Sequence, residues 1–171
     1  MCDAAAKGRS GSRFRPGVLA VIAAVLGGCG FHLQGTHELP APMARTYIQA
    51  PDQHSLFYRE LRRRLVAAGV EVVENHGAAS AVFDIRVDDT GQRVLSVSAR
   101  NVPTEYEVYY TVHYGVSADG SPLVPDQDLT LTRDYTYDAT LVLGKEREED
   151  VLRQRLANDL VRIVMEQISV Q

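Results

Sequence analysis

The clearest pattern in the chain is an alternation of apolar and polar side chains in its second half. Over residues 105–117, every second residue is apolar or aromatic and the residues between them are mostly polar. Residues 81–99 and 129–137 alternate in the same way, although Arg133 interrupts the apolar side of the last segment. A period of two places successive side chains on opposite faces of a strand. The pattern therefore predicts three strands, each with one face turned toward a core.

The strand expected over residues 81–99 contains Gly91 in its middle, where a bulge or bend is expected. The connection at residues 100–104 contains Pro103, and the one at residues 119–128 is rich in glycine and proline. Both suit antiparallel hairpins, the second with a long loop. The apolar face of the first strand is expected to hold Ala81, Phe83, Ile85, Val87, Leu95, Val97 and Ala99.

Two other segments carry apolar residues at helical spacing, one over residues 55–68 and one from about Lys145 to Ile168. Ser55 suits the N-cap of the first helix, and Gly69 suits the left-handed position after its end. The residues expected to be buried are Phe57, Leu61, Leu65 and Ala68 in the first helix and Leu152, Leu156, Leu160, Ile163 and Ile168 in the second.

The order of these elements predicts the fold class. A short strand is expected over residues 46–50, ahead of the first helix. The chain then reads strand, helix, three strands, helix. Because strands with one apolar face need a cover on that face, we expect an α+β two-layer sandwich. Its mainly antiparallel sheet of about four strands would be covered by the two helices.

The N-terminal region has the layout of a secretory signal. Residues 1–17 carry four cations against one acid, and residues 18–26 are wholly apolar. Nine helical residues span about 14 Å, under half of the ~30 Å hydrocarbon core of a bilayer. A basic segment, a short apolar run and small residues are typical of a cleaved leader. A buried N-terminal helix is the less favoured interpretation.

The residues after the apolar run, Leu26 to Cys29, resemble the bacterial lipobox. In that motif the small residues enter the peptidase and the cysteine thiol receives diacylglycerol. An ordinary signal followed by an incidental cysteine is the alternative. The prediction is a removed signal over 1–28, a lipidated tether over 29–44 and one domain over 45–171. Gly30, where inner-membrane lipoproteins have aspartate, favours the outer membrane by resemblance to their sorting rule.

Charge limits the range of partners. The 171 residues carry a formal net charge of −4, and loss of residues 1–28 would leave 143 residues with 14 basic and 21 acidic side chains. That excess of seven acids argues against nucleic acid as a ligand. Four arginines still cluster in the first helix, at Arg59, Arg62, Arg63 and Arg64. A solvated helix face is the favoured interpretation, and a surface that binds anions such as phosphate is the alternative.

Motifs for catalysis or metal binding are not found. The sequence contains no H-E-x-x-H, C-x-x-C, P-loop or G-x-S-x-G pattern, and its five histidines are scattered. Once Cys29 is acylated, no cysteine nucleophile remains in the mature chain. The sequence therefore predicts neither an enzyme nor a metal site, and no cofactor apart from the covalent lipid.

The heptad that starts at Cys29, Cys-Gly-Phe-His-Leu-Gln-Gly, closely resembles the mature start of LptE-family lipoproteins, which take part in lipopolysaccharide assembly. Residues 65–70, 98–101, 104–106 and 133–150 extend the likeness over essentially the whole mature chain. The resemblance implies a lipoprotein held on the periplasmic side of the outer membrane, which plugs the barrel protein LptD, assists its assembly and binds lipopolysaccharide. It implies no catalysed reaction.

The resemblance also implies two lipopolysaccharide-binding residues, Arg100 and Lys145, whose charge suits the phosphates of lipid A. Either could have a merely local role, with Arg100 paired to a loop acid and Lys145 preceding an acidic turn. The polar face of the strand over 105–117 would suit a wet barrel lumen. The other functions considered are a periplasm-facing lipoprotein that binds a soluble protein, such as an enzyme inhibitor, and a lipid-anchored hydrolase.

Overall fold

The computed structural model describes residues 39–136 and 142–170, all within one compact unit, with the side chains of the last helix described from residue 147. The fold is the predicted α+β class, but the sheet has five strands rather than about four. The elements, in chain order, are η1 (Ala41–Ala44), β1 (Arg45–Gln49), α2 (Leu56–Ala67), β2 (Glu71–Val73), η2 (His76–Ala78), β3 (Ala81–Val97), β4 (Pro103–Ala118), β5 (Ser121–Thr136) and α3 (Val142–Ser169).

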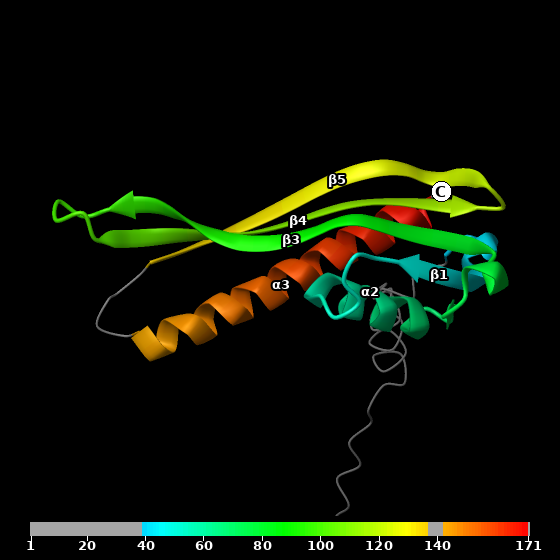
Figure 1. Cartoon of the computed structure of the whole chain (residues 1–171), viewed down its shortest axis with the longest axis horizontal. Helices are drawn as coiled ribbons and strands as arrows, with labels where there is room; N and C mark the ends of the chain where they lie inside the picture. The colour runs from blue at the N-terminus through cyan, green and yellow to red at the C-terminus, as the bar shows by residue number, and fades with distance from the viewer. Residues whose placement is uncertain (1–38, 137–141, 171) are drawn as a thin grey trace, which may run out of the picture. The chain divides into compact units, whose positions relative to one another are not determined.

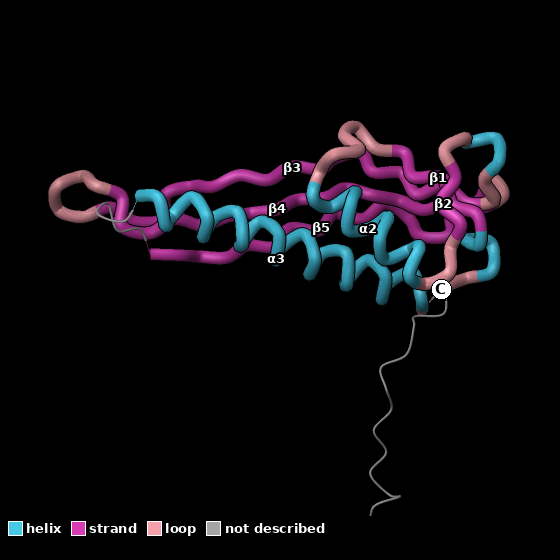
Figure 2. Tube along the Cα trace, turned by 90° about the horizontal axis from the view of Figure 1, so that it is seen from below, coloured by secondary structure: helices cyan, strands magenta, loops and turns pink. Residues whose placement is uncertain are grey.

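The sheet has the strand order β2-β1-β3-β4-β5. β1 pairs in parallel with β2 and β3, whereas β3, β4 and β5 form a long antiparallel meander. Both helices lie on the same face of the sheet, which confirms the two-layer arrangement (Figures 1 and 2). The strand that the sequence did not predict is β2, whose three residues are too few to show a period.

The helix α2 begins and ends where its capping residues predict. The Ser55 hydroxyl oxygen accepts a hydrogen bond from the Tyr58 amide at 3.0 Å. Gly69 has a φ of 87°, the left-handed conformation that glycine adopts without penalty. Phe57, Leu61 and Leu65 are fully buried, so the predicted apolar side of this helix is confirmed.

The helix α3 starts at Val142, three residues before the predicted start, so Lys145 lies inside the helix. Of its predicted buried residues, Leu156, Leu160 and Ile168 are fully buried, while Leu152 and Ile163 are half-buried. The buried side is wider than the predicted stripe, because it also contains Ala157, Val161, Val164 and Met165.

The prediction of which β3 side chains face the core is wrong beyond Ile85. The pairing with β4 shifts between Ile85 and Val87, so Arg86 is an extra residue at this point and the side chains after it change face. Val87 is consequently 41% exposed rather than buried. Arg86 remains outside the core because its guanidinium donates to both Asp84 and Asp126.

The bulge expected at Gly91 is also wrong, because Gly91 pairs in regular register with Tyr109. A close contact with Tyr109 explains why a glycine occupies this position. A Cβ atom at this position would lie 2.6 Å from the hydroxyl oxygen of Tyr109, closer than such atoms approach. The missing side chain therefore gives the Tyr109 ring room to lie over the neighbouring strand. The second register shift of β3 lies near Leu95, which is exposed, as is Val97.

The long loop expected over residues 119–128 is a tight turn. Only Asp119 and Gly120 connect β4 to β5, and both have positive φ, at 50° and 78°. The prolines that suggested a loop, Pro122 and Pro125, lie inside β5. They are tolerated because β5 is an edge strand of the sheet, where a missing amide proton need not break a ladder.

The core lies between the helices and the covered face of the sheet. The predicted apolar side of β4 is confirmed, with Val108, Tyr110, Val112, Tyr114 and Val116 buried. Phe83 of β3 stacks on Tyr114 with ring centroids 5.2 Å apart. Met43 is fully buried as well, so the core includes a residue of the stretch that the sequence assigns to the tether.

Candidate functional site

Two of the three predicted site residues lie wholly or partly outside the described part of the structure. Cys29 lies outside the described residues, and its acylation stays a prediction. The backbone of Lys145 lies in the first turns of α3, while its side chain is outside the described part. Among the described helices, none combines the length and the hydropathy that crossing a membrane would require.

Arg100 is exposed in the turn that joins β3 to β4. The Ser98 amide donates to the Val102 carbonyl at 2.8 Å, and the Asn101 amide donates to the Ser98 carbonyl at 2.9 Å. Asn101 has a φ of 61°, a conformation that asparagine adopts more readily than most residues. These hydrogen bonds close a short turn and leave the Arg100 side chain toward solvent.

The turn around Arg100 and the first turns of α3 extend toward the same end of the sheet in both views (Figures 1 and 2). The two chain segments that carry the predicted lipopolysaccharide contacts, about 45 residues apart in sequence, therefore lie toward one end of the sheet. The sequence alone did not predict this placement, since it requires the direction of α3 across the sheet.

The same end of the β3–β4 hairpin exposes four aliphatic side chains, each 43–54% exposed: Val94, Leu95, Val97 and Val102. Near them, Arg93 forms an ion pair with Glu107 across the two strands. Four exposed aliphatic side chains at one end of a hairpin, close in sequence to Arg100, can contact the apolar part of an amphiphilic ligand.

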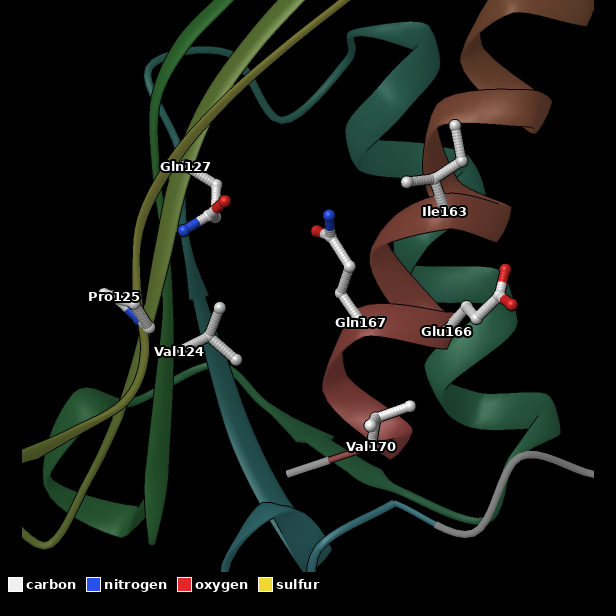
Figure 3. Close-up of a pocket in the computed structure, with 7 residues that line it drawn as sticks. All are labelled: Val124, Pro125, Gln127, Ile163, Glu166, Gln167 and Val170. Carbon is white, nitrogen blue, oxygen red and sulfur yellow. The ribbon is translucent and has the colours of Figure 1, made fainter.

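A groove of about 470 Å³ lies between β5 and the last turns of α3. Figure 3 shows Gln127 and Gln167 directed toward the space between the two elements, whereas the carboxylate of Glu166 points away from it. The other lining residues are Val124, Pro125, Ile163 and Val170. Two carboxamides among aliphatic groups can hold a polar or an apolar group, and they supply no nucleophile.

Gln167 is held in place from the core side of the groove. The hydroxyl of Tyr114 donates to its Oε1 atom. Burial raises the pKa of Tyr114 to about 12, so the hydroxyl keeps its proton and remains a donor at neutral pH. The pair joins β4 to the C-terminal part of α3.

The second face of the sheet, which we call the open face, carries neither α2 nor α3 (Figure 1). Pairing places Tyr109, Thr111 and His113 of β4 on this face, between residues of β3 and β5. The His113 Nδ1 atom lies 3.4 Å from the Asp128 carboxylate. The charged residues here are seven acids, Asp84, Asp89, Glu105, Glu107, Asp126, Asp128 and Asp134, and two bases, Arg86 and Arg93.

This face accounts for the negative charge of the part of the domain whose side chains the structure describes. Away from it, residues 39–136 and 147–170 contain equal numbers of acids and arginines, eleven of each. The acidity that the sequence reveals only as a total is therefore concentrated on the open face.

A buried polar network, which sequence reasoning missed, joins this sheet to α2. Tyr110 donates from its hydroxyl to Asp88 Oδ1 at 2.7 Å and accepts from the Phe57 amide at 3.1 Å. Ser55 donates to the other oxygen of Asp88. Burial raises the pKa of Asp88, although the hydrogen bonds from Ser55 and Tyr110 oppose that shift. The alternation placed Asp88 among solvent-facing residues, and only the extra residue at Arg86 turns it inward.

Comparisons with known proteins place the chain in a family. The model of the LptE family, described as lipopolysaccharide-assembly, matches residues 43–168. The chain is 26% identical over 151 residues to the LPS-assembly lipoprotein LptE of Pectobacterium atrosepticum, covering 85% of this chain and 81% of that protein. It is also 26% identical to the LptE of Yersinia enterocolitica, covering 85% of this chain and 72% of that protein.

Solved structures share the fold. An uncharacterized lipoprotein B from Nitrosomonas europaea is 28% identical and superimposes with a TM-score of 0.68, covering 82% of this chain and 90% of that one. The rare lipoprotein B from Shewanella oneidensis, at 21% identity, has the same fold with a TM-score of 0.64, covering 74% of this chain and 94% of that one. Because the family match runs from within η1 to the last turn of α3 and so includes every strand of the sandwich, this chain belongs to the LptE family of lipopolysaccharide-assembly proteins.

Proposed function

We propose that this protein is an outer-membrane lipoprotein that plugs the LptD barrel and binds lipopolysaccharide during its delivery to the cell surface. Membership of the LptE family carries the proposal. A lipid on Cys29 anchors the chain on the periplasmic side of the membrane, and no chemical step is assigned to any of its residues.

The open face supports the plug role. It is a broad surface of threonine, tyrosine and carboxylate side chains formed by three long strands. A barrel lumen is polar and wet, so a plug has to present polar groups rather than a large apolar patch. The acid excess on this face suits a lumen wall that carries arginine and lysine.

The test of the plug role is affinity purification of the tagged, full-length chain from outer membranes. We expect the LptD barrel to be recovered with it, and its absence would overturn the proposal. Exchanging Asp89 and Asp134 for lysine should reduce recovery, because both exposed acids lie on the open face. A matched variant with lysine at Asp150 and Glu166 of α3 should recover the barrel normally.

The hairpin end near Arg100 supports the lipopolysaccharide role. An exposed guanidinium can pair with a lipid A phosphate, and the exposed valines and Leu95 offer apolar contact to acyl chains. Arg100→Glu combined with Lys145→Glu should weaken binding of purified lipopolysaccharide severalfold. The variant Arg45→Glu with Arg162→Glu reverses two other cations and should bind as the unaltered chain does. Unchanged binding by the folded Arg100 and Lys145 variant would remove both residues from the site.

The anchor has its own test. Cys29→Ala should leave an unprocessed precursor that no longer fractionates with the outer membrane. If its fractionation were unchanged, the proposed lipid anchor would be wrong.

A further inference from the structure

The outer side of α2 carries an arginine cluster that none of the roles above uses. Arg62, Arg63 and Val66 lie three, four and seven residues after Arg59, so the four residues form one line along the helix. We call this line the arginine stripe. It is opposite to the side that buries Phe57, Leu61 and Leu65.

The four residues of the stripe line one shallow hollow of about 400 Å³ that is open to solvent. Val66 is 56% exposed within it. The hollow therefore combines three guanidinium groups with one exposed aliphatic group, a composition that suits a phosphorylated amphiphile.

Acids beneath and beside the stripe orient the guanidinium groups without neutralising all of them. The carboxylate of Glu60, only 5% exposed, accepts from Arg63 at 2.6 Å and from Arg64 at 2.9 Å. Burial raises the pKa of Glu60, but the hydrogen bonds from these two arginines outweigh that effect and the pKa lies below its usual value. Glu60 therefore stays ionised and fixes the position of Arg63.

The other two arginines of the stripe, Arg59 and Arg62, are held less firmly by acidic partners. Arg62 lies 3.1 Å from Glu74 in an exposed ion pair, an interaction that contributes little and exchanges readily. Arg59 forms no ion pair within the described part of the chain, and its side chain is exposed. Together with Arg64, which shares Glu60 with Arg63, α2 carries four arginines against the two glutamates that they contact, so its exposed surface is positive on an acidic domain.

We infer that the arginine stripe is a second contact for lipopolysaccharide, and that it binds the phosphate groups of lipid A while Val66 contacts the adjoining apolar part. The inference rests on the proposed function and adds a site to it. In the figures α2 covers the part of the sheet with β1, whereas the turn around Arg100 extends past the opposite end (Figure 1). The stripe and the Arg100 region are therefore separate contacts along one molecule.

The test compares binding of labelled lipopolysaccharide to the full-length chain and to Arg59→Gln with Arg62→Gln. Arg63 is left unchanged because its loss would deprive the buried Glu60 of a partner. Loss of two guanidinium contacts should lower the affinity roughly tenfold. The control is Arg45→Gln with Arg162→Gln, which removes two exposed arginines from β1 and α3 and should bind normally.

A second arm uses vesicles of phosphatidylcholine mixed with phosphatidylglycerol. A loss confined to lipopolysaccharide supports the inference, whereas an equal loss on the vesicles assigns the stripe to phospholipid and overturns it. Unchanged lipopolysaccharide binding by the folded stripe variant also overturns it, while the proposed function stands. If the unaltered chain binds no lipopolysaccharide at all, the proposed function itself fails. Recovery of the LptD barrel by the stripe variant should be normal.

Discussion

The two faces of the sheet serve different purposes. The covered face holds the apolar core, in which Phe83, Tyr114 and Leu160 are fully buried. The open face holds the excess of acids and contributes little buried apolar area. Because burial of apolar surface is the main stabilising contribution to folding, the covered face should determine the stability of the domain. The open face is then free to be selected for its contacts.

The largest contrast is expected from truncations on the two faces. Phe83→Ala removes a ring that stacks on Tyr114 and should lower the free energy of unfolding by about 3–5 kcal/mol. Thr132→Ala, on the open face, should change it by about 0.5 kcal/mol or less. Urea unfolding followed by circular dichroism measures both. Similar losses from the two variants would refute the division between the faces.

A smaller loss is expected in the buried polar network of the covered face. Tyr110→Phe keeps the ring but leaves Asp88 Oδ1 and the Phe57 amide without their partner. An unsatisfied buried polar group costs about 1–3 kcal/mol, so the variant should be destabilised by that amount. Tyr109→Phe is the control on the open face and should have almost no effect. A stable Tyr110→Phe protein would mean that water replaces the hydroxyl.

On the open face, a measurable loss of stability is expected only where a ring lies close to the backbone of the neighbouring strand, as Tyr109 does at Gly91. Gly91→Ala forces the Tyr109 ring to move and should cost about 1–2 kcal/mol. In a Tyr109→Ala background the same change should be almost neutral, and a double-mutant cycle measures the difference. If the cost persisted without Tyr109, the contact would not be its cause.

The smallest effect concerns the pH dependence of stability. The folded pKa of Asp88 is raised above its ordinary value near 3.8, so the folded state binds this proton more tightly than the unfolded state does. The contribution of Asp88 to the free energy of unfolding is therefore complete at low pH and falls as the pH rises through the raised pKa. Asp88→Asn should remove this fall from plots of unfolding free energy against pH.

Glu60 provides the comparison, because its pKa is lowered. Its contribution to the free energy of unfolding is present above the ordinary pKa of glutamate and is lost as the pH falls. Glu60→Gln should therefore remove a pH dependence of stability that has the opposite sign. Equal slopes for the two variants would contradict the assigned directions.

The sequence predicted those parts of the fold that depend on local pattern. Ser55 and Gly69 bound α2 as expected, and the alternation of β4 identified its buried side correctly. Prediction from the sequence failed where the pairing with another strand decides the local structure. Pro122 and Pro125 suggested a loop because the sequence does not reveal that their strand is an edge. For the site, the pattern identified the arginines of α2, but only the structure separates Arg64 from the stripe and adds Val66.

One extra residue in β3 has a consequence for insertions and deletions. Arg86 sets which of the residues after it face the helices, so Asp88 lies inward and Val87 outward. Deleting Arg86 would close the bulge and leave Ile85, Val87 and Asp88 opposite Tyr114, His113 and Val112, so Asp88 would keep its contacts with Ser55 and Tyr110. Substituting Arg86 would remove only its contacts with Asp84 and Asp126. Loss of one residue should therefore be tolerated better at Arg86 than at the paired positions 87–94, where it would exchange the two sides of the strand.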